Sequence, residues 1–282
     1  MIEIKVKNDN GEVLNLSTSP NYTLYNITGI NPPQANINTS VNATSDGDTI
    51  NSIRTNKRNI VLYVAIHGNV EANRLNLYKY FPTKKNINIY CKTTNRDVYI
   101  EGTTELIDVK LFSEQQVAQI SIICPQPYFN DVNELITSFS QIEALFTFPF
   151  SIDNNGIELS IIGNDIRKNI INAGEVDTGM SMELFAIGEV KNPVIYDVLN
   201  RTHIKLEFTM QANDIIYINT NSGQKSVTLL RDGVESNIIS YLSYSSKWLT
   251  LNAGDNVFTY DAENGVSNIK LTFRTVALYG GV

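Results

Sequence analysis

Short segments of alternating apolar and polar residues, each bounded by turn residues, run through most of the sequence and limit the fold to one built mainly from β-strands. Ile2–Lys7 and Glu12–Leu16 flank Asn10-Gly11, a pair that favours a tight hairpin because both residues tolerate positive φ. His203–Phe208 alternates in the same way and places its apolar side chains on one face. The pattern predicts a chain of short strands joined by turns.

One helix is predicted in the first half, over residues 70–81. Asn69 can cap its start, and Pro82 ends it because proline has no backbone N–H to donate. Three of its apolar residues are expected to share one face: Leu75, Tyr78 and Phe81. Strands lie on both sides of the helix without a β-α-β rhythm, which favours an α+β domain built on antiparallel sheet.

A polar stretch separates two of the predicted strands in this half. Pro32-Pro33 break the preceding strand, and Gln34–Asp48 is polar, with Gly47 flanked by aspartates. Asn59–Ile66 then forms a continuous apolar run that is typical of a buried central strand. The polar stretch is therefore interpreted as a loop or an exposed arm.

Two prolines mark the end of the first domain. Pro125 and Pro127 stop a strand, so residues 1–130 are predicted as one domain and 131–155 as a linker. Beyond it, short apolar segments recur at intervals of roughly 8–20 residues, with Gly-containing turns between them. Residues 156–282 therefore predict a β-sandwich.

Composition excludes several classes of protein. The net charge of −7 gives no support for wrapping nucleic acid, and no apolar run of about 18 residues could cross a membrane. The first residues alternate like a strand and contain no signal-peptide core, which predicts folding in a cytoplasm. Cys91 and Cys124 are then expected to be free thiols. His67 and His203 are not in metal-ligand spacing, so neither a metal nor a cofactor is expected.

No catalytic motif is present: the sequence has no GxSxG, no HExxH and no Walker loop. We therefore expect no catalytic residue and no enzyme activity. The alternative function is that of a carbohydrate-binding module for attachment to a host surface. Such modules use exposed aromatic residues, and Trp248 is the only tryptophan, with a position in the core favoured over an exposed one.

One segment is strongly basic. From Arg54 to Arg96 there are nine Lys or Arg residues and one acid, Glu71. A solvated basic face, a docking surface for an acidic partner and a nucleic-acid contact each explain this composition. The candidate contacts with a neighbouring subunit or partner are Arg54, Lys57, Arg58, Arg74, Lys84 and Lys85.

Several landmarks, in a fixed order over most of the chain, resemble one family. They are Arg96–Gly102, Cys124–Phe129 (Cys-Pro-Gln-Pro-Tyr-Phe), Asn155-Gly156, Asp214–Thr220, Trp248–Leu251 and Tyr279–Val282. In this combination the sequence resembles the siphophage distal tail proteins, which are components of the phage tail hub.

The resemblance implies a belt-type ring domain followed by a galectin-like β-sandwich. It also implies a homohexameric ring in the virion, at the phage tail tip, with a central hole through which DNA passes. The resemblance implies no specific nucleic-acid binding and no membrane insertion for the protein. The implied partners are the tail-tube protein, the tail-tip hub or tail-associated protein and receptor-binding proteins. Ring closure needs only that each subunit offers two complementary surfaces. The basic residues between Arg54 and Arg96 are then expected to point away from the central hole, towards neighbouring subunits or an adjoining tail ring.

Overall fold

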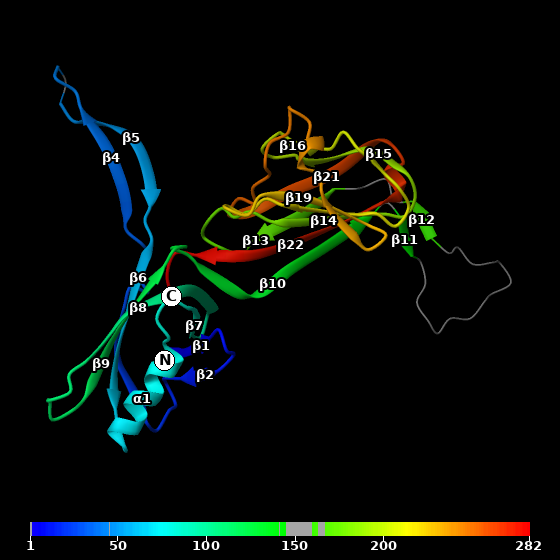
Figure 1. The fold of residues 1–282 in the computed structure, drawn as a ribbon. Coiled ribbons are helices and arrows are strands. Elements are labelled where there is room, and N and C mark those ends of the chain that lie inside the picture. The colour runs from blue at the N-terminus through cyan, green and yellow to red at the C-terminus, as the bar shows by residue number, and fades with distance from the viewer. Residues whose placement is uncertain (1, 45, 141, 145–159, 163–166) are drawn as a thin grey trace. The chain divides into compact units, whose positions relative to one another are not determined.

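The structure is a computed structural model that describes residues 2–44, 46–140, 142–144, 160–162 and 167–282 (Figure 1). The chain divides into two compact units. The first unit comprises Met1–Val132 together with Leu278–Val282, and the second comprises Asn133–Ala277. The expectation of a mainly β fold is confirmed. Within the described residues, no helix has the length and apolarity needed to cross a membrane.

The first unit is built on antiparallel strands in the order β2-β1-β7-β8-β9-β6-β3. Residues 97–103 of β8 pair with β7, and residues 103–109 pair with β9, so this long strand belongs to both halves of the sheet. The strands are β1 (Glu3–Asn8), β2 (Val13–Asn15), β3 (Tyr22–Thr28), β6 (Arg58–Ile66), β7 (Asn86–Lys92), β8 (Asp97–Val109) and β9 (Val117–Cys124).

Gly102 allows β8 to lie against β9 at the point where its pairing changes. A Cβ at this position would lie 2.7 Å from Cγ2 of Ile122 and 2.8 Å from Sγ of Cys124, closer than side chains pack. Both halves of the sheet contribute to one buried apolar core. Among the fully buried residues are Ile4, Ile60, Leu62, Ile89, Ile100 and Ile120.

The predicted helix is confirmed as α1 (Val70–Tyr80), with Asn69 capping it through a 3.2 Å hydrogen bond from the Ala72 amide. The expected apolar face is wrong in one respect, because Leu75 is exposed and Leu77 is buried. The spacing from Val70 through Leu77 to Phe81 places these side chains on the side that packs against the core.

A two-stranded hairpin leaves this unit between β3 and β6. It consists of β4 (Ala35–Val41) and β5 (Asp48–Thr55), and every residue of both strands except Thr55 is exposed. Figure 1 shows it in blue, extending away from the rest of the first unit. The expectation of an exposed arm is confirmed, and the term "arm" is used below for Ala35–Thr55.

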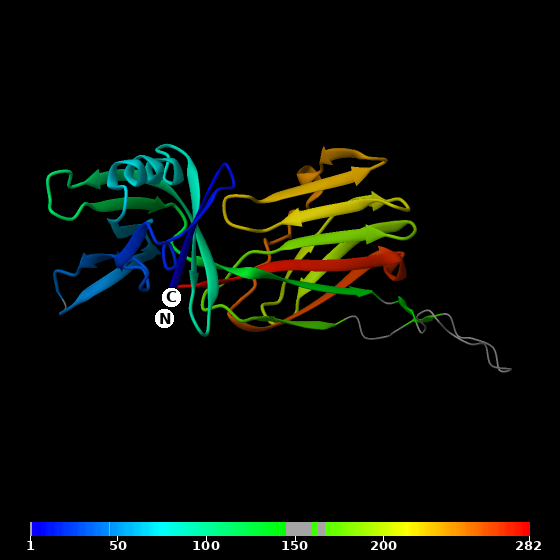
Figure 2. The same cartoon turned by 90° about the horizontal axis from the view of Figure 1, so that it is seen from below.

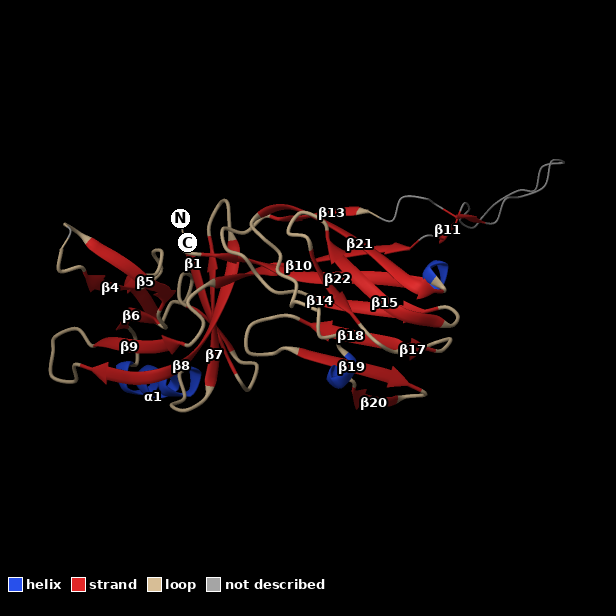
Figure 3. Ribbon diagram, turned by 90° about the horizontal axis from the view of Figure 1, so that it is seen from above, coloured by secondary structure: helices blue, strands red, loops and turns tan. Residues whose placement is uncertain are grey.

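The second unit is a two-layer β-sandwich (Figures 2 and 3). One layer contains β22-β14-β18-β19-β20, and the other contains β13-β21-β15-β16, with β17 beside β15. Both layers contribute to one core, which includes Leu184, Ile195, Phe258, Tyr260 and Phe273. The strands are β13 (Lys168–Asn172), β14 (Ser181–Ala186), β15 (Val190–Asp197), β16 (Thr202–Lys205), β17 (Thr209–Met210), β18 (Ile215–Asn219), β19 (Ser226–Arg231), β20 (Val234–Asn237), β21 (Gly254–Asn264) and β22 (Ile269–Tyr279).

Short elements complete the described part of the chain. They are two 3-10 turns, η1 (Ile239–Tyr241) and η2 (Val266–Asn268), and the strand pair β11 (Ile142–Ala144) and β12 (Ser160–Ile162).

Two neighbouring strands connect the units. β10 (Phe129–Ser140) leaves the first unit, and β22 returns to it beside β10 in the same sheet. The predicted linker 131–155 therefore begins as strand, while residues 145–159 lie outside the described residues. The expected second domain, 156–282, also differs from the observed division. Leu278–Val282 belong to the first unit, because β22 runs back into it.

Candidate functional site

The basic residues of 54–96 do not form one surface. Arg54 and Lys57 are exposed on and beside the returning strand of the arm, whereas Lys84 and Lys85 are exposed in the turn between α1 and β7. Arg74 is half-buried on α1. Four of the six candidate contacts are thus accessible to a partner, in two separate places along the chain.

Arg58 requires a correction, because its side chain is only 4% exposed and cannot contact a partner. Its guanidinium donates four hydrogen bonds to carbonyl oxygens of the same unit. Nε donates to Pro127 (2.7 Å), Nη1 to Gly29 (2.6 Å) and Asn31 (2.8 Å), and Nη2 to Gly280 (2.5 Å). Burial lowers the pKa of Arg58 from its ordinary value. These bonds compensate for the loss of water around a buried charge.

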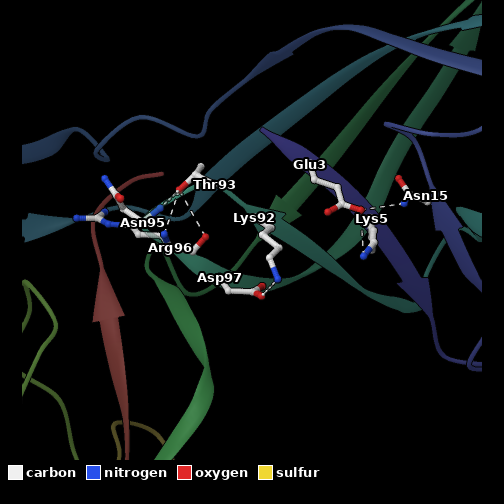
Figure 4. Close-up of polar contacts among 8 residues, drawn as sticks. All are labelled: Glu3, Lys5, Asn15, Lys92, Thr93, Asn95, Arg96 and Asp97. Atoms are coloured by element: carbon white, nitrogen blue, oxygen red, sulfur yellow. Dashed lines mark hydrogen bonds and ion pairs between the residues drawn. The ribbon is translucent and has the colours of Figure 1, made fainter. Parts of the chain in front are cut away.

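The remaining basic residues near β7 also have partners within the chain (Figure 4). The Lys92 ammonium lies 2.9 Å from the Asp97 carboxylate, and its hydrogen bond to Asp97 raises the pKa of Lys92. The turn between these residues is held by Thr93, whose Oγ1 accepts from the amides of Asn95 (3.3 Å) and Arg96 (3.1 Å). The Arg96 guanidinium donates to the Gly281 carbonyl. Some of the basic residues between Arg54 and Arg96 therefore stabilise the fold through contacts within the chain.

On the neighbouring strand β1, Glu3 is held in a similar way (Figure 4). It lies 3.1 Å from the Lys5 ammonium and accepts a 3.0 Å hydrogen bond from Asn15 Nδ2. The hydrogen bonds from Lys5 and Asn15 lower the pKa of Glu3. These half-buried polar groups are thus paired with each other.

The arm carries an apolar face that the described chain leaves uncovered. Ile37 lies opposite Ile53, and alternation along β4 places Val41 on the same side. Ile50 pairs with Thr39 and so joins this face, because the register shifts between Asn38 and Thr39. The exposed fractions are 52% for Ile37, 81% for Val41, 56% for Ile50 and 63% for Ile53.

The opposite face of the arm is polar. It carries Asn36, Asn38, Ser40, Ser52 and Arg54, which alternate with the apolar residues. Cross-strand hydrogen bonds order the hairpin. Thr39 and Asp48 share the face of the four apolar residues, and there Thr39 Oγ1 donates to Asp48 (3.0 Å); Asn42 Nδ2 donates to Thr49 Oγ1 (3.0 Å). The arm is therefore amphipathic. Sequence alternation alone did not show this, because Ile50 and Ile53 are three residues apart and reach one face only through the register shift.

A second exposed apolar group lies at the turn between β8 and β9. Leu111 and Phe112 are exposed there, together with Leu106 on β8. Ser113 Oγ bonds the carbonyls of Lys110 (2.8 Å) and Gln115 (2.6 Å), so the turn has an internally bonded shape. The first unit thus presents two apolar projections, of which the arm is the larger.

In the second unit, Trp248 does not form an exposed aromatic surface of the kind that carbohydrate-binding modules use. Trp248 is half-buried and packs against the core, with the Lys225 ammonium 5.5 Å from its ring centroid. Its most buried ion pair is structural: Arg231 Nη2 lies 2.5 Å from Oδ2 of Asp214. Burial opposes the ionisation of Asp214, but the hydrogen bonds from Arg231 and the Gln211 amide outweigh it and lower its pKa.

In the described residues, no group of three or more His, Cys, Asp or Glu could hold a metal ion. Both cysteines are buried and free, as expected. Burial raises the pKa of the thiols of Cys91 and Cys124 to about 12, so neither is a nucleophile at neutral pH.

The chain is similar to known phage tail proteins in two respects: part of its sequence matches a known family, and its fold matches solved structures. Residues 173–276 match the family described as siphovirus-type tail component, C-terminal domain. The crystal structure of the Dit (gp 19.1) protein of phage SPP1 superposes with a TM-score of 0.68 at 11% identity, over 97% of this chain and 98% of that one.

Two structures of the phage p2 baseplate in its activated conformation are also similar. The one with Ca has a TM-score of 0.50 at 12% identity, over 97% of this chain and 98% of that one. The one with Sr has a TM-score of 0.50 at 11% identity, over 98% of each chain. No curated protein matches the sequence. At these identities the structural likeness concerns the fold.

Proposed function

We propose, from the premise that residues 173–276 belong to the siphovirus-type tail component family, that this protein is a structural component of a phage tail hub. It assembles into a ring of six copies at the tail tip of the virion and catalyses no reaction. The ring joins the tail-tube protein to the tail-tip hub or tail-associated protein, lets DNA pass, and holds receptor-binding proteins. The SPP1 protein with the same fold is described as part of a hub adsorption apparatus, which supports this proposal.

The observation that carries the proposal is the uncovered apolar face of the arm. A lone two-stranded hairpin is at best marginally stable in water, and this one exposes four large aliphatic side chains on one side. Exposed apolar surface of this kind marks an interaction site. A neighbouring copy that covers the face removes Ile37, Val41, Ile50 and Ile53 from water. Repeated head to tail, this contact closes into a ring.

The exposed basic residues fit the same arrangement. Arg54 lies on the polar face of the arm, Lys57 follows its returning strand, and Lys84 and Lys85 lie in another exposed turn. Cations facing a central hole would retard DNA by binding its phosphates. We therefore place these four at contacts with neighbouring subunits or an adjoining tail ring, where charge complementarity fixes the register.

The test adds two negative charges to one face of the arm at a time. In the Ile37→Asp/Ile53→Asp variant, each ring contact would bury two carboxylates, so assembly is lost. Ser40→Asp/Thr49→Asp adds the same two charges to a cross-strand pair on the opposite face, away from Arg54, and is the matched control. Light scattering, with the tail partners present where they are needed for closure, reports roughly six times 31.5 kDa for the parent and the control. An apolar-face variant that assembles as well as the control would contradict the proposal.

A further inference from the structure

We propose that Leu278–Val282 act as a latch that fixes the root of the arm, so that the arm has one direction only while these residues are docked. This inference rests on the proposed function only for its consequence, which is assembly. The latch itself is a property of the single chain, and all the contacts that build it lie within the first unit.

Arg58 is the centre of the latch. It is the first residue of β6, three positions after the arm ends at Thr55, and its Nη1 donates to the carbonyls of Gly29 and Asn31, which lie between β3 and the arm. The same guanidinium bonds the Gly280 carbonyl through Nη2 and lies 4.7 Å from the ring centroid of Phe129. One rigid planar group therefore joins the two segments that flank the arm to Gly280.

Two further contacts hold Ile30 and Pro32, in the segment that leads into the arm, against Gly281 and Val282. The Val282 amide donates a 3.1 Å hydrogen bond to the Ile30 carbonyl. Gly281 packs so closely that a Cβ there would lie 2.9 Å from both N and Cδ of Pro32. No larger residue fits this slot without moving the chain at Pro32, three residues before the arm begins.

The latch is itself anchored on the far side. The Arg96 guanidinium donates to the Gly281 carbonyl and stacks over Tyr279, with 4.6 Å from its carbon to the ring centroid. The Tyr279 hydroxyl lies 3.1 Å from Oδ2 of Asp131. Cation–π contacts and charge-assisted hydrogen bonds of this kind are stronger than neutral contacts at exposed positions. The segment is thus held independently of the arm and can act on it.

Arg58 has no acidic partner, which distinguishes a positioning role from an ordinary ion pair. No carboxylate in the described part of the chain lies within ion-pair distance of it. Its charge is satisfied only by carbonyl groups that come from three separate segments. The four carbonyl groups surround the guanidinium only when Gly29, Asn31, Pro127 and Gly280 are all in place. Arg58 therefore couples the positions of these three segments.

The experiment measures the direction of the arm in the unassembled full-length chain. Spin labels at Asn42→Cys on the arm and Lys110→Cys at the β8–β9 turn report the distance between them, and the two native cysteines are too buried to be labelled. Gly281→Val forces the latch away from Pro32, and Arg58→Lys keeps the charge but loses the fork of hydrogen bonds. Arg54→Lys is the matched control, because Arg54 is exposed on the arm.

We expect a narrow distance distribution in the parent and in Arg54→Lys, and one at least twice as broad in Gly281→Val and Arg58→Lys. Circular dichroism selects conditions in which each variant remains folded, and Gly281→Val decides the matter if Arg58→Lys does not fold. Unchanged widths in a folded Gly281→Val protein would overturn the latch, whatever the oligomeric state. Broad distributions together with normal rings would leave the latch standing and remove its link to assembly, which overturns the proposed consequence.

Discussion

Two hairpins of the first unit have the same local construction and opposite surroundings. In the hairpin of β7 and β8, Ile87, Ile89 and Ile100 point to one side and are fully buried by the rest of the unit. In the arm, Ile37 and Ile53 also point to one side, but nothing in the described chain covers them. Alternation along each strand, together with the register of its pairing, determines which face of a hairpin is apolar. What covers that face is decided elsewhere: by the same chain in the β7–β8 hairpin and, in the proposed assembly, by a neighbouring copy in the arm.

The largest expected difference between the two hairpins is in thiol reactivity. Cys91 lies in the buried hairpin and reacts only when the unit opens, because burial raises its pKa to about 12. An Ile53→Cys thiol on the arm is accessible at all times. With an opening free energy of at least about 5 kcal/mol, the two rates differ by more than about a thousandfold. A thiol reagent followed by mass spectrometry at pH 8 measures both, and comparable rates would show that the buried hairpin is not part of a stable core.

The next difference is in stability. Ile100→Ala removes a fully buried side chain from β8 and costs about 2–5 kcal/mol, whereas Ile53→Ala on the arm changes the free energy of unfolding of the single chain by about 0.5 kcal/mol or less. Differential scanning calorimetry of the unassembled chain compares the two melting temperatures. A large loss in Ile53→Ala would mean that the arm packs on its own chain in solution, which contradicts the proposed contact.

The smallest effect concerns the turn of the arm. Gly47 has φ +84° and open space around its Cα, so Gly47→Ala meets no clash and costs about 1 kcal/mol for the left-handed backbone alone. Amide exchange in the arm then speeds up about fivefold while the melting temperature stays the same. Gly47→Asn is the control, since asparagine adopts this conformation more readily. A fall in melting temperature would instead show that the arm and the core of the unit unfold together.

Local features of the fold were predicted from the sequence because they depend on neighbouring residues. The capped helix after Asn69 and the exposed stretch after Pro33 are of this kind, and both are confirmed. The resemblance to siphophage tail proteins is also confirmed for the second unit by the family match. The ring of six copies, the partner proteins and the role of the four exposed basic residues as contact sites stay predictions.

Long-range features could not be predicted in the same way. Nothing near Tyr279–Val282 indicates that these residues return to the first unit, because that depends on the path of β22. The burial of Arg58 did have a signal that was missed. Arg58 alternates in phase with Ile60, Leu62 and Val64 on β6, all of which are fully buried, so its side chain had to point inward. The count of basic residues obscured this, since it treated every charge in the segment as a surface charge.

The return of β22 beside β10 makes the second unit an insertion within the first. Its two connections leave from neighbouring strands, so its ends are already close together and closing the first unit without it requires only a short loop. Insertions of this geometry can be replaced, lengthened or removed with little cost to the host domain. Replacing the β-sandwich at these two points therefore requires no change in the β2-β1-β7-β8-β9-β6-β3 sheet of the first unit.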